Sequence, residues 1–449
     1  MTDTVPAPGS GLAAQALLAR DEELSQLESF VLDPTVRLVT VTGPTGVGKS
    51  HLAAALGDRL WRRGVEYVVH VPLSGVPDRG LVSDAVVAAV GPADPLITIP
   101  VQALWEQHLG SPVLLVLDDV APAVQELGGF LEEMLAGYPE LTVLATSARR
   151  LGVAQEAVLR LAPFPPATMA PQDPAVMLFA RCALAADPRF ELDDSTRAAV
   201  VAVCREVGGL PLAIEIAAAR IGAMPPQLMA EQLSTSSVDL VRRVDGGDGV
   251  PERHRSLRAA VEWTVSLLPP ATRAAWAQLS VFEGSFPVDA AAAVVHPPMA
   301  TAELLDVLSD LTDSHLLTVD LAGVEPGGDG EVRFSLPDYS RAWARERLAT
   351  SGDEARACDA HASYWGRRCL IDPGVATQFW PDVLAAVDRS MSTGRHDEAL
   401  QVAAVAALGA QGSPGAEARL LPLLEAALED PSVDAALRAR SLMWATSHR

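Results

Sequence analysis

The stretch LVTVTGPTGVGKSHLAAALGDRL, at residues 38–60, constrains the fold of this 449-residue chain more than any other. Its first residues form an apolar run that predicts a buried strand, and Leu52, Leu56 and Leu60 then recur at the spacing of one helix face. Between them, residues 43–50 match the phosphate-loop pattern G-x-x-x-x-G-K-[ST], which is credible only between a strand and a helix. The sequence therefore predicts an α/β domain built around a phosphate site.

Lys49 is the only lysine among the 34 lysine and arginine residues of the chain. A compact ammonium group fits between the β- and γ-phosphates of a nucleotide, where a planar guanidinium is too bulky. Glycines bring backbone N–H groups close to phosphate oxygens, the helix N-terminus adds a positive field, and Ser50 is expected to bind Mg²⁺. The alternative is an ordinary glycine turn with a chance lysine. The predicted nucleotide-binding residues of the loop are Gly43, Pro44, Thr45, Gly46, Val47, Gly48, Lys49, Ser50 and His51.

The composition is that of a globular protein, with 49% hydrophobic residues, and the length allows about two to four domains. A net charge of −23 argues against general attraction to nucleic acid or anionic membranes. The N-terminus lacks the features of a signal peptide, and no apolar run is long enough to span a membrane, so a cytoplasmic location is expected. The four cysteines have no metal-ligand spacing and are expected to be idle thiols.

Strands that alternate with helical stretches predict a parallel sheet with its ligand at the carboxyl ends of the strands. Beyond it the pattern becomes helical, and a Gly/Asp/Pro-rich joint at 244–255 marks a boundary. After a flexible tail at 1–14, we predict an α/β P-loop NTPase domain at 15–166, an all-α lid at 167–243, a winged-helix domain at 244–350 and an α-hairpin, TPR-like array at 351–449 that looks truncated.

Two acidic residues follow an apolar run at the end of a predicted strand. Asp118 is expected to lie beside Mg²⁺ as a carboxylate near the γ-phosphate. Asp119 is expected to orient or deprotonate an attacking water. Thr146 and Ser147 end the next strand, where a hydroxyl can sense the γ-phosphate by a hydrogen bond. The alternatives are a solvated Asp-Asp turn and ordinary strand-end caps.

Pro211 interrupts a helical pattern within GGLPLAIE, at residues 208–215. Proline costs about 3 kcal/mol inside a helix, so it is expected to begin a new one. A rigid apolar proline facing the phosphate loop could pack on adenine. The alternative is an ordinary helix start with no ligand.

With these motifs in order, the chain resembles the bacterial signal-transducing NTPases with numerous domains, especially the ATPase part of large LuxR-type and AfsR-type regulators. These are relatives of the NB-ARC switches of plant resistance proteins and apoptotic scaffolds. The resemblance covers about residues 17–350. Its segments are ARDEELSQL (19–27), GPTGVGKS (43–50), LLVLDD (114–119), ATS (145–147), CREVGGLPLAIEIAAARI (204–221), RHRSLRAAVEWTVSLLPP (253–270), LSVFEGSF (279–286) and DSHLLTVD (313–320).

The resemblance implies roles at matching positions. Arg20 is expected near the adenosine and Pro211 on the adenine side of the lid, while Asp118 and Asp119 form the acidic pair. In such proteins ADP clamps the lid and winged helix onto the nucleotide domain, and exchange for ATP opens them for assembly and signalling. The expected ligands are therefore ATP or ADP with Mg²⁺, and the expected partner is a protein or a second copy bound through the helical array.

The chain departs from that family in three ways. Ala148 stands where an arginine usually follows the Thr-Ser pair, with Arg149 one residue late. The sequence Leu336-Pro337-Asp338 stands where NB-ARC relatives place Met-His-Asp, whose histidine contacts ADP. No second helix-turn-helix module is found, so no direct DNA binding is expected from this chain.

Three functions were compatible with these motifs. The first is a slow Mg²⁺-dependent ATPase that acts as a molecular switch in transcriptional regulation. The second is a nonenzymatic scaffold that ADP or ATP stabilises. The third is a P-loop transferase or kinase, which would need an acceptor-binding lid rich in arginine, whereas the lid region carries GGLPLAIE.

Overall fold

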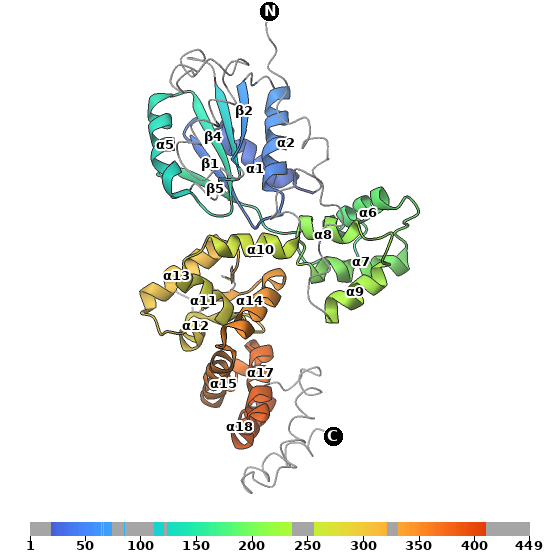
Figure 1. Cartoon of the computed structure of the whole chain (residues 1–449), viewed down its shortest axis with the longest axis vertical. Coiled ribbons are helices and arrows are strands. Elements are labelled where there is room, and N and C mark those ends of the chain that lie inside the picture. Colours follow the sequence, from blue (N-terminus) through green and yellow to red (C-terminus); the bar gives the residue numbers. More distant parts are fainter. Residues whose placement is uncertain are drawn as a thin grey trace, which may run out of the picture. The chain divides into compact units, whose positions relative to one another are not determined.

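A computed structural model describes residues 19–63, 65, 67–73, 85, 112–120, 124–235, 256–320 and 331–409 (Figure 1). The chain divides into two compact units, the first made of residues 1–267 with 313–315 and the second of 268–312 with 316–449. The predicted tail at 1–14, the joint at 244–255 and the array beyond residue 409 lie outside the described residues. The finer four-part division stays a prediction.

The first unit is built on a five-stranded sheet with the order β2-β3-β4-β1-β5. Every neighbouring pair is parallel, which confirms the predicted α/β class. β3 is buried along nearly its whole length, as expected for a strand covered on both faces. The strands are β1 (Leu38–Thr42), β2 (Tyr67–Pro72), β3 (Val113–Asp118), β4 (Leu141–Ser147) and β5 (Glu156–Arg160).

Helices cover both faces of this sheet (Figure 1): α5 (Val124–Gly137) lies on one face, and α1 (Asp21–Leu32) and α2 (Lys49–Arg62) lie on the other. The predicted leucine stripe of α2 is buried, which anchors the helix that begins at the phosphate loop. The Glu28 carboxylate of α1 forms ion pairs with two guanidinium groups at the C-terminal end of α2: its oxygens lie 3.0 Å from an Arg59 nitrogen and 2.5 Å from an Arg63 nitrogen. These ion pairs fasten α1 to the C-terminal end of α2.

The remainder of the first unit is helical, and Pro211 is the first residue of its helix, as predicted. At that position the missing N–H costs nothing, because helix N-termini have unpaired donors anyway. These helices are α6 (Pro174–Ala186), α7 (Asp194–Glu206), α8 (Pro211–Ala218), α9 (Pro226–Thr235) and α10 (Leu257–Ser266).

The second unit begins with helices that accompany a small antiparallel sheet of order β6-β8-β7, within the region predicted to be a winged-helix domain. The tip of its hairpin, residues 321–330, lies outside the described residues. Its elements are α11 (Pro270–Leu279), β6 (Phe286–Pro287), α12 (Val288–Val294), α13 (Thr301–Asp313), β7 (Thr318–Asp320), β8 (Arg333–Ser335) and α14 (Asp338–Ser351).

Further helices follow, and a buried carboxylate of one of them contacts the segment just before β6. Asp382 is fully buried and accepts hydrogen bonds from the amides of Glu283 (2.8 Å) and Gly284 (3.0 Å) and from His361 Nε2 (2.9 Å). His361 therefore has a structural role in this part of the chain. The helices are α15 (Glu354–Ile371), α16 (Val375–Gln378), α17 (Trp380–Ser392) and α18 (His396–Gly409).

The cysteines of the chain are free thiols. No disulfide links the four cysteines, and burial raises the pKa of Cys204 to about 12 and that of Cys369 to about 11, which keeps both thiols protonated. In the described part of the chain, no helix combines the length and the apolar character needed to cross a membrane.

Candidate nucleotide-binding site

The phosphate loop ends at the start of α2. Gly48 is the N-cap of that helix and has φ of 103°, a backbone conformation that side chains rarely adopt. A Cβ atom built on Gly48 would meet no heavy atom within 4 Å, so the backbone faces open space there. A helix N-terminus with exposed N–H groups is a binding site for anions such as phosphate.

Lys49 folds back across this loop. Its Nζ donates hydrogen bonds to the carbonyl oxygens of Gly43, at 2.8 Å, and Pro44, at 3.1 Å. The ammonium group is thus held against the backbone of the loop, where it could contact a phosphate group bound by that loop. The open cradle and the lysine together fit a nucleotide phosphate.

The loop is also packed against α8, which the sequence places more than 150 residues away. The Leu212 amide donates to the Gly46 carbonyl oxygen at 3.0 Å. A Cβ on Gly46, whose φ is 87°, would lie 2.6 Å from the Leu212 Cβ. Gly46 is therefore needed for the close approach of α8, in addition to any role toward phosphate.

Arg20 is buried beside the segment that leads to the lid. It donates to the Ala162 carbonyl oxygen at 2.6 Å, pairs with Glu23 at 2.5 Å, and stacks over the Phe164 ring with 4.7 Å between guanidinium carbon and ring centroid. The Phe164 amide donates to the Gly209 carbonyl oxygen at 3.0 Å. Arg20 and the residues just before Pro211 are thus linked through Phe164, which sequence reasoning missed because no local pattern marks it.

The acidic pair lies at the carboxyl end of β3, next to the end of β4. Thr146 Oγ1 donates to Asp118 Oδ1 at 2.5 Å and accepts the Asp119 amide at 2.8 Å. Asp119 itself has φ of 67°, in the left-handed region. Since Val41 of β1 is in register with Thr146, this pair and the phosphate loop share one edge of the sheet.

Ser50 and Asp118 offer oxygen ligands of the type that Mg²⁺ prefers, and both are half-buried. Within the described residues, no group of three or more His, Cys, Asp or Glu side chains is arranged to hold a metal ion. A cation at this edge would therefore rely on one hydroxyl, one carboxylate and oxygens supplied by the nucleotide. Phosphate-loop sites bind Mg²⁺ in this way.

The electrostatic environment of His315 includes the phosphate-loop lysine. Burial, followed by the positive charges of Lys49 and Arg160, lowers the pKa of His315 to about 3. Arg160 pairs with Asp313 at 3.1 Å. Sequence spacing gave no signal for this cluster, because residues 313–315 lie far along the chain from the loop.

Ala148, which follows the Thr-Ser pair, is buried, and Arg149 is half-buried. Ser147 Oγ accepts the Arg149 amide at 3.3 Å, so this hydroxyl serves as a strand-end cap. Pro337 of the Leu-Pro-Asp sequence is the N-cap of α14 in the second unit.

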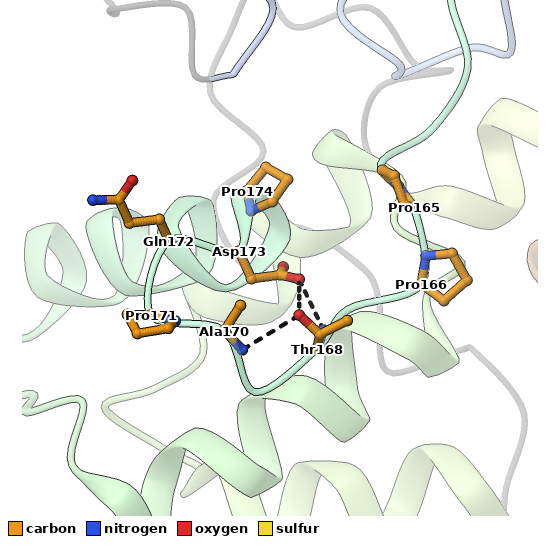
Figure 2. A pocket seen from close by; sticks show the side chains of 8 residues that line it. All are labelled: Pro165, Pro166, Thr168, Ala170, Pro171, Gln172, Asp173 and Pro174. Carbon is orange, nitrogen blue, oxygen red and sulfur yellow. Dashed lines mark hydrogen bonds between the residues drawn. The ribbon is translucent and has the colours of Figure 1, made fainter.

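A pocket of about 550 Å³ is lined by the segment that leads from the sheet into α6 (Figure 2). Figure 2 shows that the amide and hydroxyl of Thr168 donate hydrogen bonds to Asp173 Oδ2, and that the Ala170 amide donates to Thr168 Oγ1. The four acceptor contacts of Asp173 go to backbone and hydroxyl groups of the protein, so the carboxylate caps α6. The lining contains none of the predicted site residues: it consists of Pro165, Pro166, Thr168, Ala170, Pro171, Gln172, Asp173 and Pro174.

No family model matches the sequence. An uncharacterized protein of Mycobacterium tuberculosis is 30% identical over 342 residues, which cover 75% of this chain and 82% of that protein. The chain belongs to the family of this mycobacterial protein.

Two longer proteins are also similar to this chain. One protein of Mycobacterium tuberculosis, assigned by name to the HTH-type transcriptional regulators, is 32% identical over 330 residues, 73% of this chain and 35% of its own length. The regulatory protein AfsR of Streptomyces coelicolor is 29% identical over 370 residues, 78% of this chain and 34% of its own length. The chain thus spans about a third of these regulators.

Likeness to solved structures is slight. The Aeropyrum pernix ORC2 protein, solved with ADPNP and ADP, has a TM-score of 0.42 and 12% identity, over 74% of this chain and 95% of that one. Cdc6p of Pyrobaculum aerophilum has a TM-score of 0.37 and 14% identity, over 77% and 97%.

Proposed function

We propose that this chain binds ATP and ADP with Mg²⁺ and acts as a slow ATPase switch within a transcriptional regulator. The observation that carries the proposal is the phosphate loop at the start of α2, with Lys49 Nζ 2.8 Å from the Gly43 oxygen. Its backbone N–H groups and Lys49 would hold the phosphates, while Arg20, Phe164 and Pro211 would flank the base.

Ser50 and Asp118 would hold Mg²⁺, which would supply positive charge toward the phosphate oxygens of the nucleotide. Asp119 would orient the attacking water and accept its proton. Two features favour slow turnover. Asp119 is a short acid whose backbone is fixed by Thr146, and Ala148 cannot supply the positive charge that an arginine gives, which can be worth roughly 10³–10⁵ in rate.

The hydrogen bond from Leu212 to Gly46 supports a switch rather than a simple hydrolase. Any change in the loop backbone on exchange of ADP for ATP would act directly on α8. The helices of the second unit would then offer a surface for a protein partner or a second copy. The regulator names of the longer relatives favour a role in transcription, with the DNA-reading part supplied elsewhere.

A nonenzymatic scaffold stabilised by nucleotide is the second candidate, and it is favoured by the same weak hydrolytic machinery. The two differ in turnover. We expect steady-state phosphate release below about 1 s⁻¹, under the usual enzyme range of about 1–10³ s⁻¹. Asp119→Ala should lower that rate further while nucleotide affinity barely changes. No Mg²⁺-dependent release above background would favour the scaffold, and tens of turnovers per second would favour a motor or transferase.

A further inference from the structure

The hydroxyl of Thr146 joins the two residues of the acidic pair. It donates to Asp118 Oδ1 at 2.5 Å and accepts the amide of Asp119 at 2.8 Å. The Thr146 carbonyl oxygen also accepts the Val120 amide at 2.9 Å. One residue of β4 therefore holds three consecutive residues at the end of β3.

Thr146 is itself fixed by the sheet. Its side chain is 1% exposed, and its backbone is in parallel register with Val41 of β1. A β-branched residue has few χ1 choices, so the hydroxyl has a well-defined direction. The position of Asp118 is thus set relative to the strand that leads into the phosphate loop.

A hydroxyl has a single proton to donate. At Thr146 that proton goes to Asp118, so it is not directed at a γ-phosphate. Asp119 has φ of 67°, which is unfavourable for a residue other than glycine. The bond from its amide to Thr146 is a local interaction that stabilises this conformation.

We propose that Thr146 is a positioning residue, which sets the metal-side carboxylate of Asp118 and the backbone of Asp119, and does not sense the γ-phosphate. The proposal rests on the proposed nucleotide function. It differs from the sensor hypothesis in one respect. A sensor distinguishes ATP from ADP, whereas a residue that positions Asp118 affects the Mg²⁺-dependent part of binding for both nucleotides equally.

The test compares Thr146→Val, which keeps the shape and removes the hydroxyl, with Thr146→Ser, which keeps the hydroxyl. ATP and ADP are titrated by calorimetry in excess Mg²⁺ and in excess EDTA. For Thr146→Val we expect the gain in affinity that Mg²⁺ gives to fall roughly tenfold with both nucleotides, the size expected for one charge-assisted hydrogen bond. Affinity in EDTA should not change, and Thr146→Ser should restore most of the gain.

A loss confined to ATP would overturn the proposal in favour of a γ-phosphate sensor, and an unchanged Mg²⁺ gain would overturn it outright. If the unaltered protein binds neither nucleotide, the proposed function fails, and this inference falls with it.

Hydrogen exchange of the Asp119 amide gives a reading that needs no nucleotide, and its protection in the unaltered protein can be measured without any variant. We expect this amide to be protected in the unaltered protein and in Thr146→Ser, and to exchange at least about tenfold faster in Thr146→Val. Exchange in the unaltered protein as fast as in an open loop would contradict the positioning role.

Discussion

The amide nitrogen of Leu212 lies 3.0 Å from the carbonyl oxygen of Gly46, so the second residue of α8 is bonded to the middle of the phosphate loop. The two residues are 166 positions apart, and the contact joins the predicted lid to the predicted phosphate site. Through this bond a movement of the loop backbone would displace the start of α8, as the proposed nucleotide switch requires.

Gly46→Ala should break this contact. A Cβ would lie 2.6 Å from the Leu212 Cβ, and the φ of 87° is unfavourable for alanine, which alone costs about 1–2 kcal/mol. We expect a lower free energy of unfolding and weaker nucleotide binding, measured by urea unfolding and calorimetry. Gly222→Ala is the control, since a Cβ there would meet nothing within 4 Å. Equal behaviour of the two variants would exclude the proposed packing.

His315 should make stability depend on pH. Its pKa in the folded protein is about 3, below the ordinary value of 6.5, so the folded state excludes a proton that the unfolded state accepts. The stability is fully present above pH 6.5 and is lost as pH falls toward 3, by up to about 1.4 kcal/mol per pH unit. Urea unfolding at pH 6.5 and 5.5 should show a smaller pH effect in His315→Asn. The same pH effect in both proteins would refute the burial of a neutral ring.

Asp382→Ala should destabilise the second unit by about 3–5 kcal/mol, because it leaves two backbone amides and His361 without their acceptor. Thermal unfolding measures this. Asp359→Ala is the matched control on a neighbouring helix, where partly exposed ion pairs with Arg389 and Arg395 are worth only about 0–1 kcal/mol each. If both variants melt alike, Asp382 does not join the segment just before β6 to α17.

The 449-residue chain alone should not bind duplex DNA in a sequence-selective way. Its net charge of −23 opposes the phosphate backbone, although longer relatives are named as regulators. A gel-shift titration with random and genomic duplexes, at two salt concentrations, checks this expectation. A salt-sensitive, sequence-selective shift would show that DNA reading resides within this chain.

Local patterns predicted those parts of the fold that depend on neighbours in sequence. The strand, loop and helix around Lys49 follow from hydrophobic periodicity and glycine spacing, and the start of α8 at Pro211 follows from the missing N–H of proline. Each is fixed by residues within a few positions of it, so a single sequence was enough.

Contacts between distant segments were not predictable in this way. Arg20 reaches a carbonyl 142 residues away, and Asp382 binds an amide 99 residues away. The donor role of Thr146 toward Asp118 depends on the order of strands in the sheet, since β4 must lie beside β3. Such contacts become visible only when the topology is known.

Calorimetric titration of Lys49→Ala with ATP and ADP tests the central proposal most directly. Lys49 Nζ lies across the loop, 2.8 Å from the Gly43 oxygen, and supplies the positive charge of the cradle. We predict that the variant melts like the unaltered protein but loses more than about a hundredfold in affinity for both nucleotides. Arg62→Ala, which removes an exposed charge from the other end of α2, should bind normally. Unchanged affinity in Lys49→Ala would contradict the assignment of this loop as a nucleotide site.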